Sequence, residues 1–188
     1  AITYAGAGGS PYKQNDTVTI TATFDEAVAT TPKIAISGDG IANVAATNMS
    51  SSSTTVWTYT YTVPAGDATA TISLSAGADA QGNTINSTPS SGATFTVDNT
   101  APSLTQVTAI TTPGNDNTPS YIFTTNEAGT ITSNLAFSSS TSATTGDNLT
   151  ITFNALDDGT YSGKTVTVTD TAGNAGSITI PDFVIDTT

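Results

Sequence analysis

Apolar and polar residues alternate along most of the chain with a period of two. In residues 17–24 the apolar side chains occupy the even positions and threonine occupies every odd one. This pattern predicts a strand with one face in a core and the other in water. Aromatic residues follow the same pattern in residues 56–63, where Val56 and Val63 fall on opposite faces of the strand. We see no helical period longer than a turn, so the sequence predicts an all-β fold.

The alternation predicts about seven short strands in each half of the chain, separated by turn-forming residues. In the first half the clearest are 2–4, 17–24, 33–37, 56–63, 72–76 and 95–97, and in the second half 104–110, 120–125, 129–132, 149–155, 164–169 and 177–185. The Ser/Thr-rich tract 138–145 is predicted to be a loop. Antiparallel strands with one wet face pack as a two-sheet sandwich. The expected core residues are Ile20, Phe24, Trp57, Tyr59, Tyr61, Phe123, Ile151, Phe153 and Val168.

Three acidic motifs occur in the same order in both halves, which indicates an internal repeat of about 90 residues. Residues 24–27 correspond to 125–129, residues 79–83 to 170–174, and residues 98–100 to 186–188. Pro102 has no N–H for a ladder and stops the strand that ends before Asp98. We therefore predict two domains, 1–98 and 99–188. The first residues read as if they lay inside a strand, so we expect a piece of a longer protein.

The charge of the chain narrows the classes of partner. Asp+Glu number 15 against three lysines and no arginine, which gives a net charge of -12. Nucleic-acid and anionic membrane surfaces need clustered cations, so both partners are disfavoured, and cations are the natural ligands. No stretch is apolar enough to insert into a membrane. The chain also has no cysteine or histidine, which removes disulfides, thiolate zinc sites and the usual general base.

The motifs of both halves resemble the tandem bacterial immunoglobulin-like repeats of very long secreted surface adhesins, including RTX-type adhesins. The second half carries the closer match, in Asn117–Phe123, Glu127–Ile131, Asp157–Tyr161 and Val168–Asn174, and the first half matches through Trp57–Tyr59, Asp79–Asn83 and Phe95–Pro102. The resemblance implies two tandem Ig-like antiparallel β-sandwiches. It also implies a non-enzymatic stalk on the bacterial surface, whose neighbouring repeats are its partners and are often stiffened by Ca²⁺.

An Ig-like topology predicts where the acidic residues meet. The B–C and F–G loops lie at the end where the chain enters, so Glu127, Asp170 and Asn174 should face the incoming Asp98-Asn99 linker. Carboxylate and amide oxygens suit a hard cation such as Ca²⁺, which takes six to eight oxygen ligands. The equivalent residues of the first half, which we expect to bind an ion weakly or not at all, are Asp25, Glu26, Asp79 and Asn83.

Each acidic motif also has a simpler interpretation. Asp-x-x-Gly-Asn is a sequence that a β-hairpin turn prefers. The acids of 115–117 and 157–158 should lie with Asp186 at the exit end, where a second ion is an alternative. Otherwise residues 158–161 form a turn leading into a tyrosine corner, in which the Tyr161 hydroxyl bonds to nearby backbone.

The leading functional hypothesis is a monomeric structural spacer that projects a binding domain from a cell surface. The runner-up is a carbohydrate-, surface- or ice-binding module, because threonines 17, 19, 21 and 23 form an outward row beside threonines 58, 60 and 62. Every acid maps to a turn or a domain end, and nothing activates the many hydroxyls, so we expect no enzymatic activity. An intramolecular isopeptide bond would need Lys13, Lys33 or Lys164, and each is explained more simply as a solvent-facing residue.

Overall fold

A computed structural model of the chain describes residues 1–6 and 9–188. It confirms the all-β prediction, since the described residues form strands, turns and loops and no helix. The chain divides into two compact units, Ala1–Thr100 and Ala101–Thr188. We call them unit 1 and unit 2. The division falls two residues after the predicted boundary at residue 98.

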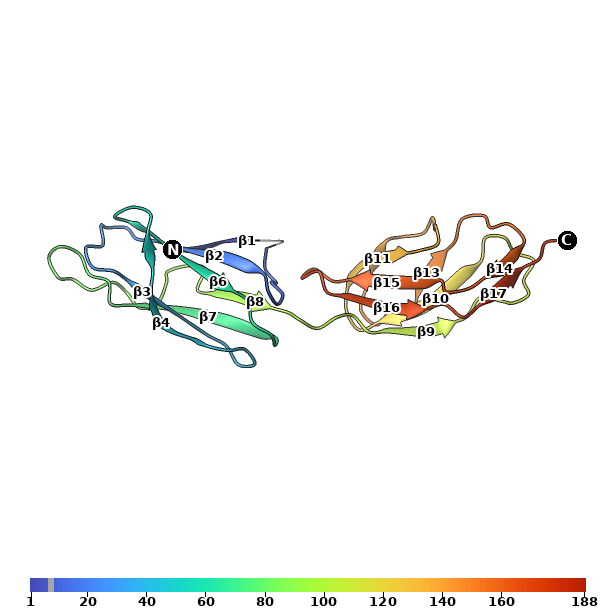
Figure 1. Ribbon diagram of the computed structural model, residues 1–188, viewed down its shortest axis with the longest axis horizontal. Coiled ribbons are helices and arrows are strands. Elements are labelled where there is room, and N and C mark those ends of the chain that lie inside the picture. The colour runs from blue at the N-terminus through green and yellow to red at the C-terminus, as the bar shows by residue number, and fades with distance from the viewer. Residues whose placement is uncertain (7–8) are drawn as a thin grey trace. The chain divides into compact units, whose positions relative to one another are not determined.

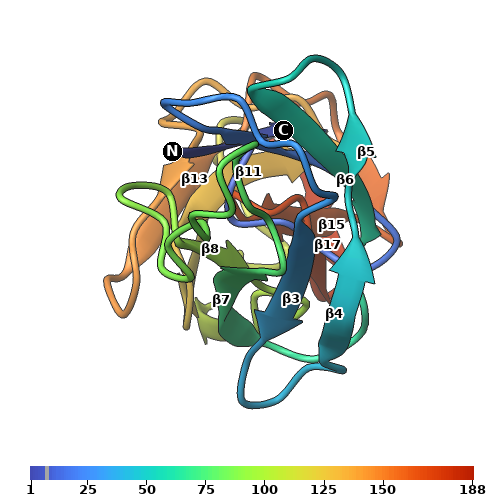
Figure 2. The same cartoon turned by 90° about the vertical axis from the view of Figure 1, so that its left-hand side faces the viewer.

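Unit 1 has two four-stranded antiparallel sheets. The first sheet has the strand order β1-β2-β6-β5. The second sheet has the strand order β4-β3-β7-β8, and Figure 2 shows these four strands in that order. Both contribute to one core that includes Ile20, Tyr61 and Phe95. The strands are β1 (Ile2–Gly6), β2 (Thr17–Thr23), β3 (Lys33–Ser37), β4 (Val44–Asn48), β5 (Ser50–Ser51), β6 (Val56–Thr62), β7 (Ala68–Ser75) and β8 (Thr94–Val97).

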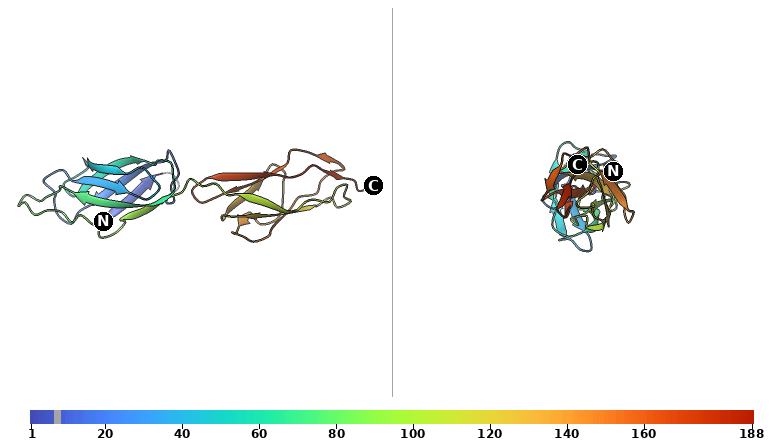
Figure 3. Two further views of the ribbon diagram at one scale, coloured as in Figure 1. Left: turned by 90° about the horizontal axis from the view of Figure 1, so that it is seen from below. Right: turned by 90° about the vertical axis from the view of Figure 1, so that its right-hand side faces the viewer.

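Unit 2 is also built from antiparallel sheets, and its strands can be followed by colour in Figures 1 and 3. One sheet has the order β13-β10-β9 and the other the order β12-β11-β15-β16, while β14 pairs with β17. Antiparallel sheets of this kind in both units are consistent with a β-sandwich architecture. The strands are β9 (Leu104–Thr108), β10 (Ser120–Thr125), β11 (Gly129–Ser133), β12 (Ser142–Ala143), β13 (Leu149–Thr152), β14 (Gly159–Tyr161), β15 (Thr165–Thr169), β16 (Ala175–Thr179) and β17 (Phe183–Ile185).

The predicted core residues lie in or against these two cores. Seven of the nine are buried: Ile20, Trp57, Tyr61, Phe123, Ile151, Phe153 and Val168. Phe24 and Tyr59 are partly buried and pack against the core of unit 1. The odd positions of strand 56–63 face the core, which decides between the two faces that Val56 and Val63 indicated. Val63 is 1 % exposed, whereas Val56 is only partly buried.

Several strand predictions were wrong in detail. The predicted strand 177–185 is two strands, since Pro181 offers no ladder hydrogen bond and β16 and β17 pair with different partners. Residues 38–55, for which no strand was predicted, contain β4 and β5, and the predicted loop 138–145 contains β12. These edge strands are exposed or very short, so their sequences show little alternation.

The exit ends of the two units match more closely than the sequence indicates. In unit 1 Tyr12 forms a parallel bridge to Val97, and in unit 2 Gly114 forms the same bridge to Ile185. A cis X-Pro bond precedes each bridge, at Pro11 and at Pro113. The repeat is therefore visible in structure at a place where only the proline is shared in sequence.

Candidate metal centre

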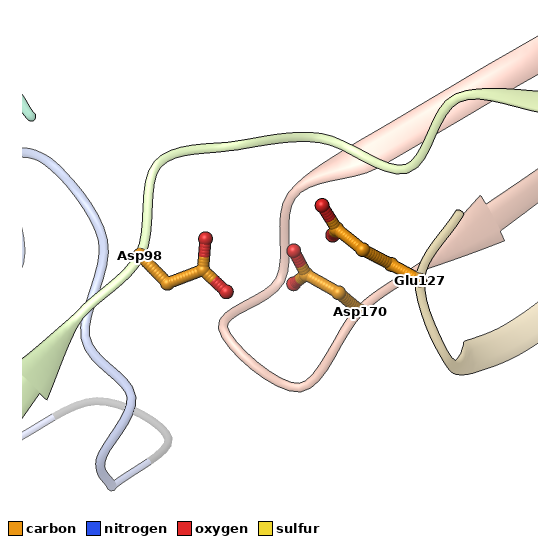
Figure 4. Close-up of side chains that lie close together, drawn as sticks. All are labelled: Asp98, Glu127 and Asp170. Atoms are coloured by element: carbon orange, nitrogen blue, oxygen red, sulfur yellow. The ribbon is translucent and has the colours of Figure 1, made fainter. Parts of the chain in front are cut away.

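Two loops of unit 2 bring a pair of carboxylates together. Glu127 lies in the loop between β10 and β11, and Asp170 follows β15 directly. One carboxylate oxygen of each lies within 4.8 Å of the other, and both side chains are partly buried. Figure 4 shows the pair side by side and also labels Asp98, which follows β8 in unit 1. An acidic pair with this spacing could hold a metal ion.

Glycine allows the two loops to approach. Gly129 begins β11, and a Cβ atom there would collide with the Thr169 carbonyl oxygen and lie 2.9 Å from a methyl group of Val168. The close contact places the loop of Glu127 against the strand end that carries Asp170. Thr125 fixes the other side of this loop, because its buried hydroxyl accepts a hydrogen bond from the Glu127 amide at 3.3 Å.

Asp170 sits in a hairpin turn that it also stabilises. Its two carboxylate oxygens accept bonds from the amide and the side-chain nitrogen of Asn174, at 2.8 and 2.9 Å. The Asp170 amide donates to the Asn174 carbonyl, and Gly173 takes a φ of 87°. The hairpin-turn interpretation therefore describes this segment correctly. It is compatible with metal binding, because a carboxylate oxygen can accept more than one interaction.

The Asn174 side chain is oriented by this turn. Its amide nitrogen donates to Asp170, which directs the amide oxygen away from that residue. Its role as a metal ligand stays a prediction.

Asp98 and Asn99 are described within unit 1. The Asp98 amide donates to the Tyr12 carbonyl at 2.9 Å, and its carboxylate accepts from the Thr100 amide at 3.1 Å. The Asn99 side chain is engaged at both ends, since its oxygen accepts from the Gln14 amide and its nitrogen donates to the Gly66 carbonyl. Asn99 thus anchors the exit segment to unit 1, and its predicted role as a ligand is untested, as is that of Asp98.

The equivalent residues of unit 1 surround one pocket of about 400 Å³. Asp25, Glu26, Asp79 and Asn83 all line it, together with Phe24 and Ile85. Asp79 and Asn83 form the same turn as Asp170 and Asn174, with bonds of 2.8 and 2.7 Å and a φ of 89° at Gly82. Within the described part of unit 1, these acids do not form a group of three with the spacing of metal ligands.

Hydrogen bonds from Asn83 and neighbouring amides lower the pKa of Asp79. The shift reflects the hydrogen bonds of the turn, since burial acts in the opposite direction.

The exit-end acids of unit 2 bond to threonines. Asp158 accepts the amide and hydroxyl of Thr187 at 3.0 and 2.7 Å, and Asp116 accepts both from Thr118. Among the residues that the structure describes, they do not form a second group of three acids. The Tyr161 hydroxyl donates to the Asp157 carbonyl at 2.9 Å, as the tyrosine-corner alternative predicts, but residues 159–161 form strand β14 and not a turn.

Sequence reasoning missed the part that Asp67 plays. Its carboxylate accepts the Asn99 amide and the Thr100 hydroxyl, and these bonds lower its pKa, the hydroxyl bond most. Asp158 does the same for Thr187 in unit 2. The shared signal is an acid directly before a strand, Asp67 before β7 and Asp158 before β14, but in the sequence both look like ordinary turn residues.

Comparison with protein families finds no matching family model, and comparison with curated proteins finds no match. Within residues 1–6 and 9–188, no helix has the length and hydropathy to cross a membrane.

Proposed function

We propose that the chain is a pair of non-enzymatic, Ig-like extender modules of a large bacterial cell-surface adhesin, joined at a junction that Ca²⁺ stiffens. The observation that carries the proposal is the Glu127–Asp170 pair, which two separate loops bring together at the end of unit 2 where the chain enters. The repeated architecture of the two units supports a spacer role. The partners would be neighbouring repeats of the same secreted chain.

Charge makes a cation the expected ligand of this pair. Two carboxylates at 4.8 Å repel by roughly 3–4 kcal/mol at an effective dielectric of 20. Unit 2 has one lysine, Lys164, and it precedes the strand β15 that Asp170 follows. Strand β15 rises about 3.3 Å per residue, so its whole length separates Lys164 from the Glu127–Asp170 pair. A cation from solution would remove the repulsion.

Asp98 is the proposed third ligand. Pro102 is buried in unit 2, and the Ser103 amide donates to the Asn126 side chain at 2.6 Å, next to Glu127. Four residues span at most about 14 Å, so the covalent chain keeps Asp98 near the pair in every orientation of unit 1. A third carboxylate would favour Ca²⁺ over Mg²⁺, which keeps its waters and demands strict octahedral geometry.

Small-angle X-ray scattering tests the proposal directly. We expect millimolar Ca²⁺ to narrow the range of conformations and to change the maximum dimension relative to EDTA, and Mg²⁺ to have a smaller effect. The Asp98→Asn variant should lose most of this response, whereas Asp186→Asn, which changes the equivalent acid of unit 2, should keep it. Identical scattering of the wild type in EDTA and Ca²⁺ would overturn the proposal.

One surface supports a second candidate, a module that binds carbohydrate, an ordered surface or ice. On the outer face of the first sheet of unit 1, the register aligns Thr3, Thr21, Thr58 and Ser50 across four strands. Thr19–Thr60 and Thr17–Thr62 form further rows on the same face. None of the described residues of β1, β2, β5 and β6 is charged, in a chain of net charge -12. A glycan array and an ice-recrystallisation assay, each with a Thr21→Lys/Thr60→Lys control, test this alternative.

A further inference from the structure

The segment between the two units is held from both sides, and each hold can be described within one unit. On the unit 1 side, Asp67 accepts hydrogen bonds from the Asn99 amide and from the Thr100 hydroxyl. The Asn99 side chain adds bonds to the Gln14 amide and the Gly66 carbonyl. The chain is therefore tied to unit 1 as far as Thr100.

On the unit 2 side, the chain is tied from Pro102 onward. Pro102 is buried, and its carbonyl oxygen occupies the position that a Cβ atom of Gly176 would need. Ser103 exchanges two hydrogen bonds with Asn126: its amide donates to the side-chain oxygen at 2.6 Å, and its carbonyl accepts from the Asn126 amide at 3.2 Å. β9 then begins at Leu104 and pairs with β10.

These two sets of contacts leave one residue between them, Ala101. A residue before proline is biased toward extended conformations, so this position is itself restricted. We propose that Asp67 on unit 1, and Gly176 with Asn126 on unit 2, act as two clamps that reduce the junction to a hinge of one residue. They are positioning residues, because they limit how far Asp98 can move from Glu127 and Asp170.

The hinge depends only on contacts within each unit and needs no metal ion. Its effect on metal binding rests on the proposed function. Without the clamps the free segment would lengthen from Ala101 alone to residues 100–103, because Asp98 and Asn99 keep their other bonds to unit 1. Asp98 would then sample a larger volume relative to Glu127 and Asp170. Ordering that segment would then oppose metal binding through its conformational entropy. The clamps lower this conformational-entropy cost, because they order the segment before any ion binds.

Spin labels on the exposed positions Thr69 of unit 1 and Ser177 of unit 2 would report the hinge as a distance distribution, measured by pulsed EPR on the full chain. In EDTA we expect Asp67→Ala and Asn126→Leu each to broaden the distribution. Each loses hydrogen bonds that shift a clamped-to-open equilibrium by about two- to tenfold. Asn126→Asp keeps an acceptor for the Ser103 amide and should restore the narrow distribution. Unit 1 carries Asp25 at the position that corresponds to Asn126, so an aspartate is compatible with the fold there.

Asp158→Ala is the matched control, since Asp158 makes the same kind of bonds to Thr187 but lies at the far end of unit 2. It should leave the distribution unchanged. The clamps are overturned if the wild type in EDTA is as broad as Asp67→Ala and Asn126→Leu, or if Asp158→Ala broadens it equally. Amide exchange of Ser103 in EDTA gives a second readout, with protection expected in the wild type and lost in Asn126→Leu.

The clamps and the calcium junction can be refuted independently of each other. A wild type that ignores Ca²⁺ but is narrow in EDTA keeps the clamps and refutes the calcium junction. A wild type that is broad in EDTA and narrow in Ca²⁺ refutes the clamps and keeps the junction. If both hold, Asp67→Ala should also weaken Ca²⁺ binding by about two- to tenfold, as measured by calorimetry.

Discussion

At the residue scale, two buried aromatic side chains of unit 1 carry polar atoms that have no hydrogen-bond partner among the described residues. They are the Tyr61 hydroxyl and the indole nitrogen of Trp57. Burial raises the pKa of Tyr61, which is 2 % exposed and packs edge-on against Phe95 at 5.7 Å between ring centroids. A buried polar atom without a partner costs free energy and adds nothing to packing.

Tyr61→Phe should therefore change the free energy of unfolding by less than about 1 kcal/mol, in either direction. The ring and its packing stay, and the unpaired hydroxyl is removed. Chemical denaturation would measure the change. A loss above about 2 kcal/mol would show that the hydroxyl makes a stabilising hydrogen bond.

Trp57→Ala should cost much more, about 3–5 kcal/mol, because it removes a large buried side chain from the core of unit 1. Trp57→Phe is the matched control: it keeps most of the packing, removes the unpaired nitrogen and should cost clearly less. Denaturant melts of both variants would test this. Equal losses in the two would contradict the packing argument.

Asp67 predicts a dependence of stability on pH. The hydrogen bonds from Thr100 and Asn99 lower its pKa from the ordinary value of 3.8, so they stabilise unit 1 above that pH. The contribution is lost as pH falls through the lower pKa of the folded state, because the carboxylate is then protonated. The wild type should melt above Asp67→Asn at pH 6, and the gap should shrink below pH 3.8. A gap that persists in strong acid would show that packing, and not charge, is responsible.

At the scale of elements, Gly129 controls the distance between the two acidic loops of unit 2. Gly129→Ala places a methyl group against the Thr169 carbonyl, and we expect a loss of about 1–3 kcal/mol in stability, as for other overpacked sites. Glu127 should also move away from Asp170, so the Ca²⁺-dependent rise in melting temperature should fall. Gly38→Ala is a milder control, because its nearest atoms at 3.1 Å belong to the flexible Ile41 side chain. Thermal melts with and without Ca²⁺ would compare the two variants.

Elements with strict alternation could be predicted from the sequence, and those without it could not. The β2 and β6 strands have one buried face and one hydroxyl-bearing face, so their pattern shows both strand and register. β4 has one partly buried residue followed by four exposed ones, so burial leaves no pattern to read. The break at Pro181 could have been predicted, since proline cannot occupy the middle of a paired strand.

The same contrast holds for the candidate site. Asp170 and Glu127 were found because acids at loop positions converge once the strand order is known. Asp67 and Gly176 were not, since an acid in a turn and a glycine in a hairpin have many uses. Their roles depend on contacts with residues 32 and 74 positions away in the chain, Asn99 and Pro102, which no local pattern contains.

At the scale of the whole molecule, the two units supply a controlled test of calcium binding. In both the Asp79–Asn83 and the Asp170–Asn174 turn, the asparagine donates two hydrogen bonds to the aspartate, and Asp79 also accepts one from the Gln81 amide. In EDTA, Asp79→Ala should therefore damage its hairpin at least as much as Asp170→Ala damages the other. Only Asp170 belongs to the Glu127 pair. Binding to the folded state alone raises stability by an amount set by ion concentration over Kd, about 2.7 kcal/mol at 100 times Kd.

We therefore expect Ca²⁺ to raise the melting temperature of the wild type and of Asp79→Ala by similar amounts, and that of Asp170→Ala little or not at all. Scanning calorimetry over a Ca²⁺ titration would measure each increment, and intrinsic fluorescence of Trp57 would report the melting of unit 1 separately. If Asp170→Ala responds to Ca²⁺ as the wild type does, the ion binds elsewhere. If Asp79→Ala loses the response and Asp170→Ala keeps it, the site belongs to the pocket of unit 1, and the junction would have to be rigid without calcium.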